Sequence, residues 1–368
     1  MDVPTQFSHR KQEIELEKRK ILKSRSTRIM FMLALLAVVI IAAGYSVTQG
    51  STSISILTTY EVLLNDLTQS LFDIEYFDVH PSYTFIVNHI RGPRVMMAVF
   101  AGAILALGGA LMQTLFRNPL ATPYTLGISS GAGFGATLYF IFGISLLPGT
   151  YGLIANAFIC SMIPAAIIFV AATNKKVTPT TMVLGGVAIS YMFSACNTLS
   201  QYFGDSDAVK DVVFWSVGDL NSVSLSQVPY AAITALLLFA FSMIISRNLN
   251  IMRMGDDSAK SLGVNVNVTR IAVVGVVCLS TAVIISFTGP IGFVCLLSPH
   301  ISRKLVGNDL RYLLPASAVI GATLLVFADY LAKMALDPIL LPVGAITALI
   351  GAPVLSYLLF IKRANTPD

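Results

Sequence analysis

Residues 94–119 read RVMMAVFAGAILALGGALMQTLFRNP and carry no charged side chain between Arg94 and Arg117. An α-helix needs about 20 consecutive apolar residues to cross the hydrocarbon core of a bilayer. Small residues such as Gly108 and Gly109 would allow neighbouring helices to approach closely. The stretch therefore predicts a membrane-spanning helix that packs tightly against other helices.

The rest of the chain has the same character. Hydrophobic residues make up 55% of its 368 residues and charged residues only 12%, against roughly 25% charged in soluble domains. Too few polar side chains remain to cover a water-facing surface, so we expect an all-α, polytopic membrane protein with about ten transmembrane helices. The candidate spans are residues 29–47, 93–114, 124–143, 150–172, 181–203, 227–246, 269–288, 291–306, 313–336 and 341–361.

Basic residues are distributed unevenly between the two sides of this predicted bundle. With the N-terminus in the cytoplasm, 20 of the 24 Lys and Arg residues fall on inner segments, and the outer segments are acidic. Cytoplasmic loops of membrane proteins carry such an excess of positive charge. We therefore expect a multi-pass protein of the cytoplasmic (inner) membrane, surrounded by lipid, with both termini inside. The basic residues do not cluster on one face, so no nucleic-acid partner is predicted.

This topology divides the chain into three parts. Residues 1–28 are expected to form a cytoplasmic N-terminal helix or tail, residues 29–362 the transmembrane domain, and residues 363–368 a C-terminal tail. Within the transmembrane domain, residues 48–90 form a long outer segment and residues 247–268 a cytoplasmic loop.

The cytoplasmic loop contains MGDDSAKSLGV at residues 254–264. Asp256 or Asp257 is expected to cap a short helix that ends before Gly263. Such a helix could be a docking point for a soluble partner or an ordinary connector, and the spacing alone favours neither interpretation.

Several motifs that carry chemistry are absent from the sequence. It has no GxxxxGK[ST] phosphate loop, so we do not expect the chain to bind and hydrolyse ATP by that route. It also has no HExxH or GxSxG motif and no paired carboxylates within its spans, so a membrane enzyme has no visible catalytic residues. The cysteines form no CxxC pair or Cys/His cluster, and we expect small buried hydrophobes without a metal role. They are Cys160, Cys196, Cys278 and Cys295.

An ordered set of short blocks resembles a known family. The blocks are RGPR at 91–94, AGAILALGGALMQTLFRNPLATPYTLGISSGAG at 101–133, FWSVGDL at 214–220, GDDSAKSLGV at 255–264, GPIGFVCLLSPHISR at 289–303, FADYLAK at 327–333 and LPVGAITALIGAPV at 341–354. Together, and in this order, they resemble the FecCD family of ABC-importer permeases. The resemblance covers residues from Arg91 to Lys362.

The resemblance implies the type II ABC-importer permease fold, with ten transmembrane helices in each subunit. It implies a second permease subunit, identical or related, two separate subunits that bind ATP and Mg²⁺, and an extracytoplasmic solute-binding protein. The chain itself would need no cofactor. The loop after the sixth span would form the helices that couple the permease to the ATPase. The matching residues are Met254, Gly255, Asp256, Asp257, Ala259, Leu262 and Gly263.

The resemblance also assigns roles at both ends of the bundle. Arg91, Arg94 and Lys333 would contact glutamates of the binding protein, with headgroup anchoring as the alternative for the two arginines. Lysine at 333, where the family often has arginine, keeps the charge but loses the bidentate fork. A cytoplasmic gate would be formed after the second span and before the fifth, and the fifth and tenth spans would line the pathway. The matching gate residues are Asn118, Pro119, Leu120, Pro179 and Thr180.

Two polar residues lie at membrane depth. Asp329 in the ninth span is a functional candidate by position, but the favoured interpretation is a structurally buried residue near the outer end. His300 follows Pro299 at an expected helix break, and a helix-packing hydrogen bond is favoured over contact with substrate.

The leading hypothesis is therefore a permease that imports an iron–siderophore complex with energy from a partner ATPase. Haem and cobalamin are the alternative cargoes. An ion-coupled secondary transporter that uses Asp329 is the rival mechanism.

Overall fold

The computed structural model describes residues 30–50, 52–74, 76–173, 178–336 and 339–364. Within these ranges the regular structure is helical, apart from an isolated β-bridge between Leu336 and Ile339. This confirms the all-α class. The N-terminal tail predicted at residues 1–28 lies outside the described residues, and so do residues 365–368 of the predicted C-terminal tail.

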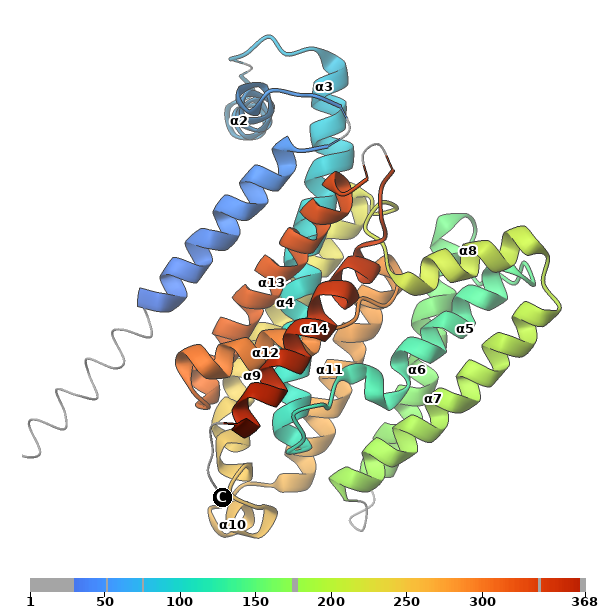
Figure 1. Cartoon of the computed structure of the whole chain (residues 1–368), viewed down its shortest axis with the longest axis vertical. Helices are drawn as coiled ribbons and strands as arrows, with labels where there is room; N and C mark the ends of the chain where they lie inside the picture. The colour runs from blue at the N-terminus through green and yellow to red at the C-terminus, as the bar shows by residue number, and fades with distance from the viewer. Residues whose placement is uncertain (1–29, 51, 75, 174–177, 337–338, 365–368) are drawn as a thin grey trace, which may run out of the picture.

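The helices follow one another in an elongated bundle (Figure 1). The unlabelled first helix is Met30–Thr48. The others are α2 Ile56–Phe72, α3 Pro81–Phe85, η1 Ile86–Arg91, α4 Gly92–Leu115, η2 Pro123–Leu126, α5 Ile128–Phe140, α6 Thr150–Thr173, α7 Pro179–Tyr202, α8 Ser206–Val217, η3 Leu225–Gln227, α9 Val228–Met252, α10 Asp256–Ser261, α11 Val266–Thr288, α12 Val294–Val306, α13 Leu310–Met334 and α14 Val343–Ala364.

Each predicted span coincides with a helix, but the helices differ in length. Seven helical segments of the described chain are long and apolar enough to cross a membrane. Helices α5 and α12 have 13 residues each, so at 1.5 Å per residue each is about 20 Å long, shorter than a hydrocarbon core of about 30 Å. Helix α14 is apolar over Val343–Tyr357. The seven long segments are Met30–Thr48, Pro81–Leu115, Tyr151–Ala171, Thr180–Tyr202, Leu225–Met252, Val266–Thr288 and Leu310–Met334.

The second span begins earlier than the sequence predicts. The helix starts at Pro81, runs through the π-helical turn η1 and continues as α4. At the end of η1 the Gly92 N–H donates to the Val87 carbonyl, the wider hydrogen bond that defines a π turn. The prediction of 93–114 placed the boundary at Arg91 and Arg94 because charges usually mark a membrane end, whereas here both lie inside one continuous helix.

Helix α4 is the centre of the bundle and packs against α9, α11, α12 and α13. Two glycines make the closest contacts possible. A Cβ on Gly102 would lie 2.4 Å from the carbonyl oxygen of Gly321 in α13, and a Cβ on Gly109 would lie 1.9 Å from that of Cys295 in α12. Neither position has room for a side chain, so the backbones touch, as the small residues predicted.

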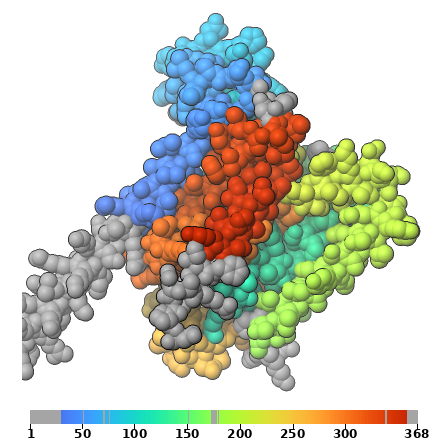
Figure 2. Space-filling view, viewed as in Figure 1, coloured from blue at the N-terminus to red at the C-terminus, as the bar shows by residue number. Residues whose placement is uncertain are grey.

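Helices α5, α6, α7 and α8 form a second group beside this centre (Figure 1). Helix α5 packs against the other three, and α6 connects the group to α11. In the space-filling view α14 and the pair α7 and α8 lie on the same face of the molecule (Figure 2).

The two ends of the bundle have different coverings, and they are named here the α2 end and the α10 end (Figure 1). At the α2 end, the predicted outer segment folds into α2, α3 and η1. A small apolar cluster that includes Val47, Val62 and Val87 fixes it to the first helix and α4. At the α10 end, the six-residue helix α10 connects α9 to α11.

Candidate functional site

A buried ionic cluster lies towards the α2 end, on α4 and α13. The Nε atom of Arg94 donates to Asp329 Oδ1 at 2.6 Å, and Nζ of Lys333 lies 2.7 Å from Asp329 Oδ2. Arg94 also donates to Oδ1 of Asn221. Asp329 is fully buried, and Arg94 and Lys333 are 5% and 4% exposed. Two cations thus surround one carboxylate inside the protein, and the Arg94–Asp329 pair joins α4 to α13.

Arg91 is also buried, but it has a different set of partners. Its guanidinium donates to the carbonyl oxygens of Val47, Thr48 and Thr52. Val47 and Thr48 are the last residues of the first helix, where carbonyl groups lack intrahelical partners. Arg91 therefore caps the C-terminal end of that helix.

Three basic residues were expected to reach a binding protein from the outer face, with headgroup anchoring as the alternative for the two arginines. They are Arg91, Arg94 and Lys333, and in this structure all three are buried and bonded within the chain. Their contact with a binding protein stays a prediction. The interpretation of Asp329 as a structurally buried residue agrees with its two ion pairs.

At the α10 end, the predicted short helix is present, with a different cap. Gly255 is the N-cap at φ +125°, and no side chain caps the helix, so the prediction of Asp256 or Asp257 as the cap was wrong. Both aspartates lie in the first turn instead, where negative charge complements the helix dipole. The helix ends at Ser261, before Gly263, as predicted.

The helix buries one side and exposes the other. Ala259 is fully buried, while the side chains that flank the helix, Met254 and Leu262, are 73% and 62% exposed. Two large apolar side chains are thus exposed at the two ends of this short helix.

Asp256 attaches α10 to two neighbouring helices. Its Oδ2 accepts from Arg270 of α11 at 2.7 Å, and its Oδ1 accepts from Arg117, just beyond α4. Arg117 also donates to the Met252 carbonyl at the end of α9 and has a left-handed backbone, at φ +51°. Arg117 was not among the predicted site residues, although it is the lone basic residue of the loop after the second span, which was a usable signal.

The predicted gate residues begin right after Arg117. Asn118 Oδ1 accepts from the Leu120 N–H at 2.9 Å, and the Asn118 N–H donates to the Gln113 carbonyl at 3.1 Å, so the turn is held to the end of α4. Pro119 and Leu120 are exposed. On the other predicted segment, Pro179 starts α7 and Thr180 follows it. That the two segments close a passage together stays a prediction.

A hydrogen-bonded chain crosses from α12 to α4 near this turn. Pro299 lies inside α12 without breaking it, contrary to the expected break. Because proline has no N–H, the carbonyl of Cys295 lacks its helical partner, and Gln113 Nε2 of α4 donates to it at 3.3 Å. Gln113 Oε1 in turn accepts from Arg303 NH1 at 2.6 Å. His300 Nδ1 lies 3.2 Å from the Leu296 carbonyl of its own helix.

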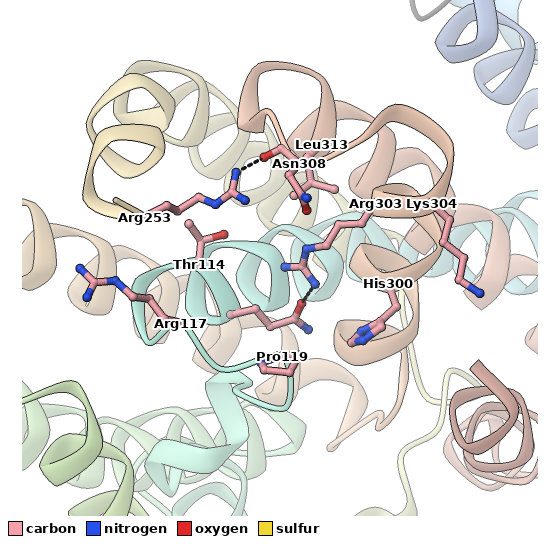
Figure 3. A pocket seen from close by; sticks show the side chains of 10 residues that line it. Thr114, Arg117, Pro119, Arg253, His300, Arg303, Lys304, Asn308 and Leu313 are labelled. Atoms are coloured by element: carbon pink, nitrogen blue, oxygen red, sulfur yellow. Dashed lines mark hydrogen bonds between the residues drawn. The ribbon is translucent and has the colours of Figure 1, made fainter. Parts of the chain in front are cut away.

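A cavity of about 620 Å³ opens beside this chain (Figure 3). Its lining comes from the ends of α4 and α9, from α12 and from the start of α13. Arg117 and Pro119 line it, and so does His300. No group of three or more His, Cys, Asp or Glu side chains able to hold a metal ion occurs in the described part of the chain.

Solved structures and curated relatives identify the class. A structure provisionally described as a metal-chelate type ABC transporter, in an inward-facing conformation, superposes with a TM-score of 0.77 at 28% identity and covers 90% of this chain and 99% of that one. The Fe(3+)-citrate import permease YfmD of Bacillus subtilis is 33% identical over 90% of this chain and 95% of its own length. The hemin transport permease HmuU of Yersinia pestis is 33% identical over 91% and 96%.

The long apolar helices and these likenesses define a multi-pass transmembrane subunit of an ABC importer. The model of the FecCD transport family matches residues 32–361, and the chain belongs to that family. Other relatives are named as permeases for iron(3+)-hydroxamate and cobalamin import. The chain is accordingly a permease subunit of an ABC importer.

Proposed function

We propose that this permease carries a ferric siderophore across the cytoplasmic membrane, driven by ATP hydrolysis in two separate partner subunits. A second permease subunit and an extracytoplasmic binding protein complete the assembly, and ATP and Mg²⁺ bind to the ATPase subunits. The α10 end faces the cytoplasm. The observation that carries the proposal is α10 itself, an exposed helix that Asp256 attaches to Arg117 beside the gate turn.

The contacts of Asp256 support a coupling role. A displacement of α10 acts on Arg270 and thus on α11, and on Arg117 and thus on the turn at 118–120. The link to α11 is largely shielded, since the Arg270 side chain is 6% exposed. A force applied at Met254 and Leu262 would therefore be transmitted to the gate turn through the carboxylate of Asp256. The helices would then move as coupled rigid elements.

We choose a ferric siderophore as the cargo because of the cargoes that the relatives' names give. Their names cover ferric citrate, ferric hydroxamate, hemin and cobalamin, and most of these are iron complexes. No residue described above reads the chemistry of the cargo, so specificity belongs mainly to the binding protein. Haem and cobalamin remain the alternative cargoes.

The ion-coupled alternative has weaker support. A carboxylate that binds and releases a coupling ion must be reached from water, whereas Asp329 is fully buried between two cations. Both of its oxygens already have a cationic partner, which leaves no free position for a coupling ion. The geometry favours a structural role.

The binding protein would meet the α2 end at its exposed surface. Helices α2 and α3 and the loop between them project from this end (Figure 1), and Phe72 and Tyr76 there are 68% and 65% exposed. Aromatic side chains of this kind are enriched at protein interfaces. The docking contact is therefore assigned to α2 and the α2–α3 loop.

The test is a pair of matched substitutions in the reconstituted importer. Leu262→Asp should weaken binding of the ATPase subunit about tenfold or more, since burying a charge at an apolar contact costs more than 1.4 kcal/mol. The control is Leu225→Asp at the other end of α9, where the leucine is 45% exposed. Equal ATPase binding by both variants would remove α10 from the interface.

The cargo is tested in the same proteoliposomes. ATP-driven uptake is measured with a ferric hydroxamate, ferric citrate, hemin and cobalamin, each presented by the cognate binding protein. We expect the ferric hydroxamate to be taken up fastest. Faster uptake of hemin or cobalamin would show that the proposed cargo is wrong, and the proposed coupling mechanism would be unaffected.

A further inference from the structure

The cavity at the α10 end is positively charged. Figure 3 shows Arg253 and Arg303 reaching into it from opposite sides, Arg253 above Thr114 and Arg303 beside it, while Arg117 and Lys304 lie at its edges and point away. The two central side chains come from the end of α9 and from α12, so the fold brings them together from segments far apart in the chain. Their like charges oppose one another.

Nothing in the described part of the chain neutralises these charges. Arg253, Arg303 and Lys304 form no ion pair with the Asp and Glu side chains of the described residues. Arg253 NH1 donates at 2.5 Å to the Asn308 carbonyl, and Arg303 NH1 donates to Gln113. Each guanidinium has five N–H donors, so most donors of both residues remain available to a ligand.

A hydrogen bond to Gln113 fixes the position of Arg303. Pro299 frees the Cys295 carbonyl, Gln113 binds that carbonyl through Nε2, and the Gln113 Oε1 holds Arg303. This chain fixes the arginine in a half-buried position. A guanidinium held in this way is organised in advance for an anion, because little side-chain freedom is lost on binding.

The location of the cavity indicates which class of ligand it can bind. The lining comes from the ends of helices α4, α9 and α12 and from the loop that leads into α13, and the ends of membrane-spanning helices lie at the level of lipid headgroups. Basic pockets between such helix ends bind phosphorylated headgroups. Helices α7 and α14, which were predicted to line the translocation pathway, contribute no lining residue, which favours a ligand other than the cargo.

We propose that this cavity binds a phosphate group through Arg253 and Arg303, with Lys304 at its edge, and that the phosphate is supplied by an anionic phospholipid headgroup or by free phosphate. Two guanidinium groups can each donate a pair of parallel hydrogen bonds to phosphate oxygens. The bound anion cancels the repulsion between them. Because Pro119 also lines the cavity, the occupant lies against the gate turn.

The experiment uses the full-length permease purified in an uncharged detergent without phosphate. Phosphatidylglycerol, phosphatidylcholine and inorganic phosphate are titrated separately, with bound lipid counted by native mass spectrometry and the melting temperature recorded in parallel. We expect phosphatidylglycerol to bind and to raise the melting temperature, and phosphatidylcholine to do neither. An equal effect of inorganic phosphate identifies free phosphate as the source. Failure of both phosphatidylglycerol and inorganic phosphate to bind overturns the proposal.

Variants locate the binding in this cavity. Arg253→Gln with Arg303→Gln should weaken it about tenfold or more, since hydrogen bonds to charged groups contribute about 1.5–3 kcal/mol. Lys304→Gln, on an exposed side chain, should produce a smaller loss and tests the site even if the double variant folds poorly. The control is Arg311→Gln, outside the cavity and paired with Asp309. Unchanged lipid and phosphate binding in the double and the Lys304 variants overturns the proposal. Binding of the ATPase subunit is measured for the same variants. If they lose ATPase-subunit binding and keep lipid and phosphate binding, the proposal is also overturned and the cavity is assigned to an acidic protein surface.

Discussion

Each end of the bundle contains an arginine–aspartate ion pair, and the two pairs differ in their exposure to water. At the α2 end, Arg94 and Asp329 are 5% and 0% exposed, whereas at the α10 end Arg117 and Asp256 are 41% and 31% exposed. In the first case separation would leave charges in a nonpolar interior, while in the second water replaces each lost contact. The comparison assigns the buried cluster to structure and the exposed pair to a contact that can open and close.

The largest expected effect comes from breaking the buried cluster. Asp329→Asn removes the charge that compensates both Arg94 and Lys333, and loss of one partner of a buried ion pair costs about 3–5 kcal/mol. The free energy of unfolding in detergent should fall by that amount. The combined variant with Arg94→Met, Asp329→Leu and Lys333→Met should recover much of the loss. If Asp329→Asn proved as stable as the parent, the cluster would not be structural and the ion-coupled mechanism would gain support.

A smaller effect on stability, with a larger one on transport, is expected at the α10 end. Arg117→Gln should lower the free energy of unfolding by less than about 1 kcal/mol, because its pair with Asp256 is partly exposed. Asp256→Asn should lower it more than Arg117→Gln does, because it also removes the partner of the shielded Arg270, but less than Asp329→Asn does. Cargo moved per ATP hydrolysed in proteoliposomes should fall about tenfold, a coupling change of about 1.4 kcal/mol.

The matched comparison for this prediction lies one residue further on, at another residue of the predicted coupling loop. The Asp257 side chain is 98% exposed, and among the described residues its ion pair is with Lys260 of the same helix. Asp257→Asn therefore removes no contact with Arg117 or Arg270 and should lower the transport ratio less than Asp256→Asn does. A double variant of Arg117 and Asp256 should be no worse than Asp256→Asn alone, because the aspartate substitution already removes the contact between them. Additive losses would show that the two residues act separately.

The smallest expected effect is a pH dependence at the start of α13. A hydrogen bond from Arg311 lowers the pKa of Asp309 to about 2, and a second hydrogen bond, from Asn250, acts in the same direction. The unfolded pKa is about 3.9, so the folded state gains stability above about pH 4 and loses it as the pH falls towards 2. Chemical unfolding between pH 5 and pH 2.5 should show a loss below about 1 kcal/mol that Asp309→Asn lacks. An identical loss in that variant would place the titrating group elsewhere.

The fold was predictable because long apolar runs have few alternatives to membrane helices. The close contacts at Gly102 and Gly109 followed from the small residues of the same stretch. The start of the second span was misplaced because Arg91 and Arg94 look like residues at a membrane boundary. Only the fold shows that carbonyls of the first helix and Asp329, both distant in sequence, bind them.

The candidate site was predictable in part. The helix at 256–261 and its exposed neighbours followed from the loop sequence and the family resemblance. Arg117 was missed because its role depends on Asp256 and Met252, residues far along the chain. The link from Pro299 through Gln113 to Arg303 was out of reach for the same reason, since a missing N–H says nothing about which side chain replaces it.

The most direct test of the central claim compares two preparations of sealed proteoliposomes. One contains the permease alone under an imposed proton or sodium gradient, and the other contains the permease with its ATPase subunit, binding protein and ATP. The account predicts accumulation of ferric siderophore only in the second preparation. Uphill uptake by the permease alone would contradict it.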